Sequence, residues 1–131
     1  MMKNITNKTT RYIYVDFENI NNFNESVCIN NAFCIFFINQ HQKIDKIVKF
    51  VNKNHCELIP MYSAGKNCMD FYIIHYLTLN LINDSNAEHY ILSKDKGFDS
   101  IIKHINEQNY EHKVTRINDI NLLKQISAKW R

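Results

Sequence analysis

The sequence contains 131 residues, of which 45% are hydrophobic and 22% charged, and these values are ordinary for one globular domain. We therefore expect residues 1–131 to form a single domain, with residues 1–10 as a flexible N-terminus. No apolar stretch is long enough to cross a membrane, and the polar start is unlike a secretory signal, which together predict a cytoplasmic protein. The formal net charge of +3 permits a polyanionic partner without requiring one.

Segments that predict strands alternate with segments that predict helices. Strands are expected at short apolar runs, and helices where apolar residues recur every three or four positions. In chain order, the predicted strands are residues 12–15, 32–38, 56–62, 89–92 and 113–117. The predicted helices contain residues 44–51, 69–81, 101–105 and 122–126. The asparagine-rich stretch 19–31 predicts a loop with room for a short helix.

This alternation is typical of βαβ crossovers, which build a parallel sheet with helices on both faces. Residues 32–38 (AFCIFFI) support this architecture because they are apolar at every position, whereas a half-exposed strand would alternate with polar residues. We therefore predict an α/β domain with a central parallel sheet of about five strands.

Acidic residues follow the predicted strands at the points where the strands end. Asp16 ends the first strand, Asp70 follows the third strand at the start of the long helix, and others follow the fourth strand. In an open parallel sheet, sites form beyond the carboxyl ends of the strands. The acidic residues that we expect to meet at this edge are Asp16, Glu18, Asp70, Asp95 and Asp99.

Each of these residues also has a purely structural interpretation. Asp70 lies three positions after Asn67, so the pair could form a helix-capping box. Asp95 or Asp99 could cap the helix that follows them, and Glu18 could be a solvated loop residue. Asp16 is harder to explain in this way, because burying a carboxylate at a strand end costs free energy unless the group is paired or bound to a metal.

A cluster of these carboxylates would need a cation. Like charges brought together repel and raise one another's pKa. Mg²⁺ and Mn²⁺ prefer oxygen ligands and keep several waters, so a few carboxylates can hold them. The cysteines and histidines lack the spacing of a zinc site. The cluster therefore indicates a Mg²⁺ or Mn²⁺ site that could activate water against a phosphate.

Basic, hydroxyl and aromatic residues near this edge are candidates for contact with a nucleic acid. The residues that could bind phosphate are Lys66, Lys94, Lys96, Ser63 and Ser93. For the lysines, simple solvation is the alternative. Tyr72, Tyr76 and Phe98 could stack on bases, although core packing is the better interpretation of Tyr76.

Three segments carry a resemblance to a known family. YIYVDFENI at residues 12–20 resembles the opening strand of PIN-like and NYN nucleases, with an Asp, an acid and an Asn in succession. SAGKNCMDFYI at 63–73 is similar to their helix-opening motif, and ILSKDKGFDSIIKHI at 91–105 to their third motif. The segments follow the family's order and cover most of the chain between residues 12 and 117.

The resemblance implies a Rossmann-like α/β/α sandwich and an endoribonuclease that uses Mg²⁺ or Mn²⁺, acting on single-stranded RNA. Asp16, Asp70, Asp95 and Asp99 match the family's acidic quartet, Asn19 the residue that steadies the first motif, and Glu18 its second acid. The third motif departs from the family in placing lysines around Asp95. Targeting would come from this domain, from a homo-oligomer or from a regulatory protein partner, and a toxin or defence role is compatible with the resemblance.

Two other functions stay open at this point. A degenerate PIN-like module would bind RNA or a protein without cutting. A haloacid-dehalogenase-like phosphatase would also place an Asp at the end of strand one, and Asp95 and Asp99 have its D-x-x-x-D spacing. That class, however, needs a second Asp where Glu18 stands, so we favour the nuclease.

Overall fold

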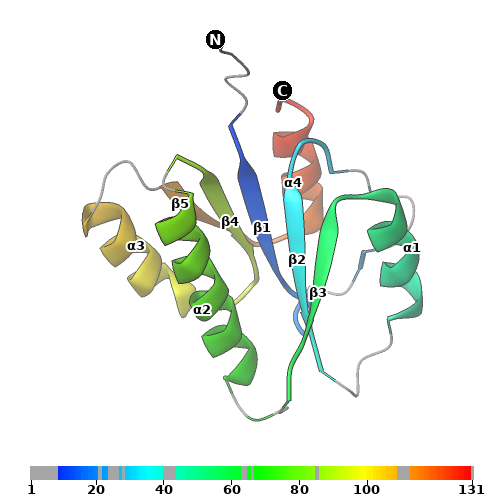
Figure 1. Ribbon diagram of the computed structural model, residues 1–131, viewed down its shortest axis with the longest axis horizontal. Coiled ribbons are helices and arrows are strands. Elements are labelled where there is room, and N and C mark those ends of the chain that lie inside the picture. The colour runs from blue at the N-terminus through cyan, green and yellow to red at the C-terminus, as the bar shows by residue number, and fades with distance from the viewer. Residues whose placement is uncertain are drawn as a thin grey trace.

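The computed structural model describes residues 9–20, 22–23, 27, 29–39, 44–62, 65, 67–84, 86–108 and 113–130. Within these residues, strands and helices alternate as predicted (Figure 1). Their bounds are β1 Arg11–Asp16, β2 Phe33–Ile38, α1 Asp45–Lys53, β3 Cys56–Pro60, α2 Cys68–Asn83, β4 Glu88–Leu92, α3 Phe98–Gln108, β5 Lys113–Ile117 and α4 Ile120–Ser127. No helix among the described residues is long and apolar enough to span a membrane.

Some predicted boundaries were wrong. β3 ends at Pro60, two residues before the predicted end of that strand, on an edge of the sheet where proline is tolerated. α3 begins at Phe98, before the first apolar residue of its helical repeat. The expected flexible N-terminus falls mostly on residues 1–8, which lie outside the described part. In the stretch 19–31, the described residues contain no helix, and residues 21, 24–26 and 28 lie outside the described part.

The strands form one parallel sheet in the order β3-β2-β1-β4-β5. From β1 the chain builds outward through β2 to β3, then returns to place β4 on the other side of β1. The order of strands therefore reverses between β1 and β4. In such sheets, the crevice at the carboxyl ends of the two strands beside the reversal is the usual position of a site.

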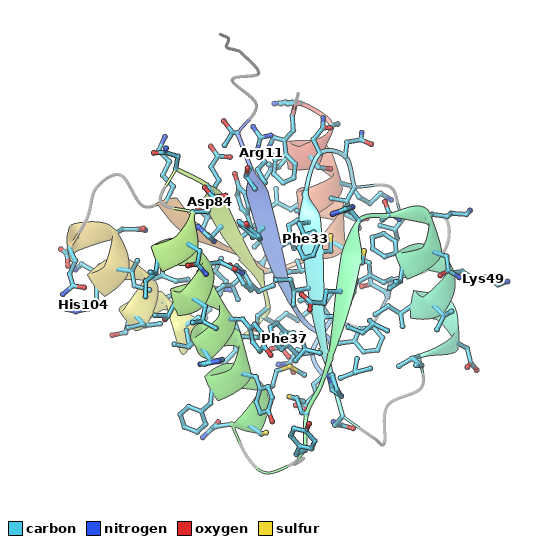
Figure 2. All side chains as sticks on the ribbon, viewed as in Figure 1. Arg11, Phe33, Phe37, Lys49, Asp84 and His104 are labelled. Carbon is cyan, nitrogen blue, oxygen red and sulfur yellow. The ribbon has the colours of Figure 1, made fainter. Side chains whose placement is uncertain are left out.

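Helices cover both faces of the sheet, as expected for an α/β/α sandwich (Figure 1). α1 and α4 pack on one face, and α2 and α3 on the other. Alternate residues of β1 serve the two layers, because successive side chains of a strand point to opposite faces. Ile13 and Val15 join the first layer, whereas Tyr14 joins the second. On the second face, Phe37 lies between the sheet and α2, where its ring centroid is 5.6 Å from that of Tyr76 (Figure 2).

Phenylalanine rings fill the core on the α1 side. The Phe36 ring lies 4.9 Å from Phe23, 5.7 Å from Phe50 and 6.1 Å from Phe17, in edge-to-face arrangements. Such pairs are favourable beyond the area that they bury. Because Phe17 directly follows the last residue of β1, this cluster also anchors the chain at the edge where the acidic residues lie.

We expect Phe36→Ala to lower the free energy of unfolding by about 3–5 kcal/mol, because it leaves a cavity among packed rings. Urea denaturation followed by circular dichroism would measure the change. Phe71→Ala is the matched control, because the Phe71 side chain is 72% exposed and little packing is lost. Similar losses in the two variants would contradict this description of the core.

Candidate active site

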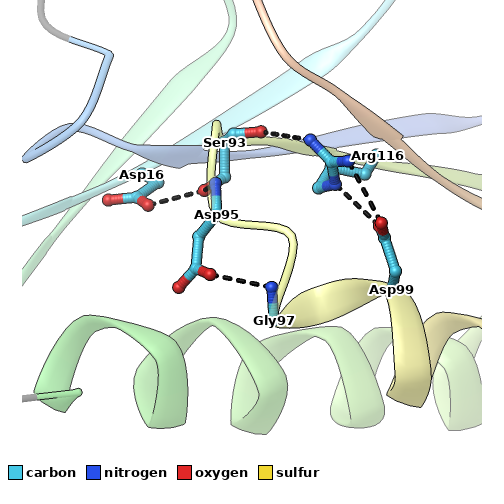
Figure 3. A network of polar contacts seen from close by, with 6 residues as sticks. All are labelled: Asp16, Ser93, Asp95, Gly97, Asp99 and Arg116. Atoms are coloured by element: carbon cyan, nitrogen blue, oxygen red, sulfur yellow. Dashed lines mark hydrogen bonds and ion pairs between the residues drawn. The ribbon is translucent and has the colours of Figure 1, made fainter.

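Asp16 is the centre of the candidate site. It is the last residue of β1, and only 1% of its surface is exposed. Its Oδ2 atom accepts a hydrogen bond from Ser93 Oγ at 2.7 Å (Figure 3). The same oxygen accepts a second hydrogen bond from Asn19 Nδ2 at 2.8 Å. Ser93 directly follows β4, and Asn19 lies in the turn after β1. The Ser93 bond therefore joins the ends of β1 and β4, where the strand order reverses.

The second carboxylate oxygen of Asp16 has no such support. Oδ1 is buried and has no hydrogen-bond partner among the described residues. Leaving a buried charged oxygen unsatisfied costs free energy, and native structures usually have a reason for it. A cation that this oxygen could bind would be such a reason.

The loop after β4 holds Asp95 in a defined orientation (Figure 3). The Asp95 backbone N–H donates to Ser93 Oγ at 3.0 Å, and the Gly97 N–H donates to Asp95 Oδ1 at 2.8 Å. A Cβ atom at position 97 would lie 2.9 Å from that same oxygen, closer than real Cβ contacts come. Glycine at this position therefore allows the loop to approach the carboxylate. Ser93 thus links two acidic residues through one hydroxyl.

Asp70 lies in the first turn of α2, and the capping box that was its structural alternative is not formed. Asn67 precedes the helix with a left-handed backbone (φ 65°) and makes no side-chain capping bond. Burial raises the pKa of Asp70 to about 6, together with the charges of Asp95, Asp16 and Glu18. The structure therefore brings Asp70 into the electrostatic field of the other three acids.

Asp99 is placed differently, at the start of α3. Its carboxylate forms a two-bonded ion pair with Arg116, at 2.7 Å from Nε and 3.1 Å from Nη2 (Figure 3). The hydrogen bond from Arg116 lowers the pKa of Asp99. Arg116 Nη1 also donates to the Ser93 carbonyl at 3.2 Å, which ties this pair to the same loop. Sequence analysis missed Arg116, although its charge near the carboxyl end of a predicted strand was a usable signal.

The structure describes most of the remaining predicted site residues. Glu18 is exposed and its Oε1 accepts a hydrogen bond from Asn39 Nδ2 at 3.1 Å. Lys94 and Lys96 are exposed on the loop after β4, and Lys94 lines a pocket of about 220 Å³ beside Asn19. Ser63 and Lys66 lie outside the described residues. Phe98, a candidate for base stacking, is only 3% exposed and belongs to the core.

The residues present suit a divalent cation with oxygen ligands. In the positions that the structure describes, no three His, Cys, Asp or Glu side chains are arranged closely enough to hold a metal ion. The chemistry of the donor set nevertheless fits, because Asp16 offers a buried unpaired oxygen and Asp70 carries a charge that its acidic neighbours oppose. Hard oxygen donors are the ligands that Mg²⁺ and Mn²⁺ prefer.

The raised pKa of Asp70 predicts a stability change. The value of about 6 exceeds the ordinary 3.8, so the folded protein binds this proton more tightly than the unfolded chain, and stability falls as the pH rises from 4 to 6. We expect Asp70→Asn to be more stable than wild type at pH 7, by about 1 kcal/mol after allowance for solvent screening. The gain should disappear near pH 4.

Urea denaturation at pH 4 and pH 7, in the presence of chelator, would measure this difference. Asp45→Asn is the matched control, because Asp45 also lies in the first turn of a helix, α1, but its side chain is exposed to solvent. It should lose a little stability at pH 7, since a negative charge favours a helix N-terminus. A destabilised Asp70→Asn at pH 7 would contradict the electrostatic description of the cluster.

Comparison with known proteins agrees with this architecture. A family model described as PIN domain matches residues 10–115, a span that contains β1 through most of β5 and every acidic residue of the candidate site. Searches of curated proteins and of solved structures gave no match. The match confirms the PIN-like resemblance, while the NYN subtype stays a prediction. The chain therefore belongs to the PIN domain family, whose members are generally metal-dependent nucleases.

Proposed function

We propose that this protein is a divalent-metal-dependent endoribonuclease whose site is centred on Asp16. The observation that carries the proposal is the buried Asp16 carboxylate at the crevice between β1 and β4, with one oxygen doubly hydrogen-bonded and the other unpaired. A carboxylate fixed in this way is costly for stability and well suited to a cation. Because the chain belongs to a family of nucleases, a catalytic role is the expected purpose of such a cation.

The proposed ligands are Asp16, Asp70 and Asp95, whose carboxylates would move closer together around a bound cation, with Glu18 nearby. When bound, Mg²⁺ or Mn²⁺ supplies Lewis-acid activation of water and of the scissile phosphate. Asn19 and Ser93 hold Asp16 in place through the hydrogen bonds to its Oδ2. The Gly97 N–H orients Asp95. These contacts orient the carboxylates before substrate arrives, which is the main contribution that a protein makes to such a site.

Exposed basic residues near the candidate site could bind the phosphate backbone of a nucleic acid. Lys94 and Lys96 extend from the loop that also carries Asp95, so they can offset the charge of non-bridging oxygens. We propose Lys66 and Ser63 as further phosphate contacts. Ser93, which the sequence also suggested as a phosphate contact, is fully buried, and we propose that it acts instead through its hydrogen bonds to the two aspartates. RNA as the polymer, an oligomer, a regulatory protein partner and a toxin or defence role are proposals that rest on the family resemblance.

A second candidate function is a catalytically degenerate module that binds RNA or a protein. The observation that favours it is the engagement of Asp99 by Arg116, together with the absence of a three-ligand group among the described side chains. In this alternative, the acidic residues would keep the fold of a nuclease without its chemistry.

The decisive experiment incubates purified protein with labelled single-stranded RNA and DNA, in Mn²⁺, in Mg²⁺ or in chelator. We expect metal-dependent cleavage that Asp16→Asn and Asp95→Asn abolish and that Asp45→Asn retains. Cleavage that is equal in wild type and in both site variants would come from a contaminant and would remove the support for this function. Binding of RNA with no cleavage in any metal would establish the degenerate module instead.

Asp99 provides a finer test of how the site is built. Sequence analysis made it a metal ligand, but its pairing with Arg116 supports a position outside the first set of ligands. We expect Asp99→Asn to lower activity by about 10- to 100-fold, the range typical of outer-shell partners. Asp16→Asn should fall to the background measured in chelator.

A double-mutant cycle would separate the two roles of Asp99. If it acts through Arg116, then Asp99→Asn combined with Arg116→Gln should cost little more than either change alone, because the two residues share one interaction. Loss of Mn²⁺ binding in Asp99→Asn to the same degree as in Asp95→Asn would instead make Asp99 a direct ligand. Isothermal titration calorimetry would measure the Mn²⁺ affinity of each variant.

A further inference from the structure

We infer that Tyr62 and Phe71 form a stacking platform for unpaired bases at the edge of the candidate site. The inference rests on the proposed function and adds to it the residues that would hold a single strand by the faces of its bases. We use the term stacking platform for these two residues only.

The two rings are unusually exposed for this protein. Tyr62 is 94% exposed and Phe71 is 72% exposed, whereas phenylalanines such as Phe23 and Phe36 are fully buried. Burying a phenylalanine ring stabilises a fold, so an exposed ring forgoes that stabilisation. Aromatic rings at nucleic-acid sites do so because a base later covers them.

Buried neighbours hold both rings at the carboxyl edge of the sheet. Tyr62 comes two residues after the end of β3, and Phe71 directly follows Asp70 in the first turn of α2. Met61 directly precedes Tyr62, and Met69 lies two positions before Phe71. Both methionines are buried in the same core cluster. The Tyr62 backbone N–H also donates to the hydroxyl of Tyr72 at 3.4 Å. The platform is therefore tied to the helical turn that carries Asp70.

The surroundings favour a nucleic acid over an apolar protein surface. Phe71 directly follows Asp70, one of the acids of the candidate site, and exposed Lys94 and Lys96 lie on the loop that carries Asp95. Rings interleaved with cations are the usual platform for single strands, because every base has a face that can stack while the phosphates meet positive charge. A duplex keeps its bases stacked on one another, so it presents only their edges to these rings.

Another exposed apolar residue of α2 provides an internal comparison. Ile82 is 74% exposed, almost the same fraction as Phe71, but it lies near the opposite end of the helix. At 1.5 Å per residue, it is about 18 Å along the helix from Asp70. A partner that simply covered the apolar side of α2 would use Ile82 as well, whereas a strand bound at the site would not.

The test uses Asp95→Asn as a background that should bind without cleaving, since an amide oxygen can still accept from the Gly97 N–H. Fluorescence anisotropy would measure the affinity for a labelled single-stranded RNA oligomer and for a duplex of the same sequence, both with Mn²⁺. Adding Tyr62→Ala or Phe71→Ala should weaken single-strand binding by about 5- to 100-fold, the effect of losing one stacked base. Tyr62→Phe should retain affinity because it keeps the ring, and Ile82→Ala should leave it unchanged.

Either of two results would overturn the stacking platform. Alanine at both ring positions could leave single-strand affinity unchanged, or Ile82→Ala could weaken it as much as Phe71→Ala does, which would indicate a general apolar surface. Cleavage by the otherwise wild-type protein separates this failure from a failure of the proposed function. If wild type cuts RNA and the alanine variants bind as well as their background, only the platform is wrong, whereas a wild type that neither binds nor cuts removes both.

Discussion

The hydrogen bond from Ser93 Oγ to Asp16 Oδ2 is the interaction on which the candidate site depends. It joins the ends of β1 and β4 where the strand order reverses, and both of its side chains are buried. The same hydroxyl accepts the backbone N–H of Asp95, so one small side chain sets the position of two acidic residues. Because all strands are parallel, the sheet itself delivers these groups to one edge.

The arrangement of the acidic residues at this site lowers the stability of the fold. Asp16 retains a buried oxygen without a partner, and the pKa of Asp70 is raised because burial and neighbouring charges oppose its ionisation. Natural proteins accept such local costs mainly where function requires them. Arg116 relieves part of the negative charge by pairing with Asp99, and so separates that residue from the others. The acidic edge thus contains two kinds of residue. Asp16 keeps an unpaired buried oxygen, and ionisation of Asp70 is unfavourable. The charge of Asp99 is instead paired with Arg116.

The amino-acid sequence by itself determined the fold class and the edge where the site lies. Apolar runs such as residues 32–38 predict strands that are covered on both faces, and the helical repeat of residues 69–81 matches the buried residues of α2. Asp16, Asp70 and Asp95 could be predicted as neighbours because parallel strands end on the same side. Boundaries were less predictable, since the ends of β3 and α3 depend on local backbone bonds that no apolar pattern reports.

Tertiary structure alone decided which partner each acidic residue has. Arg116 and Asp99 are 17 positions apart along the chain, and they meet because β5 pairs with β4 and α3 packs beside β5. Burial likewise sorted the aromatic residues, placing Phe98 in the core and leaving Tyr62 and Phe71 in water. The physical reason is that residue type and spacing determine which edge a side chain reaches. The partner it finds there, and the water it loses, depend on contacts between segments distant in sequence.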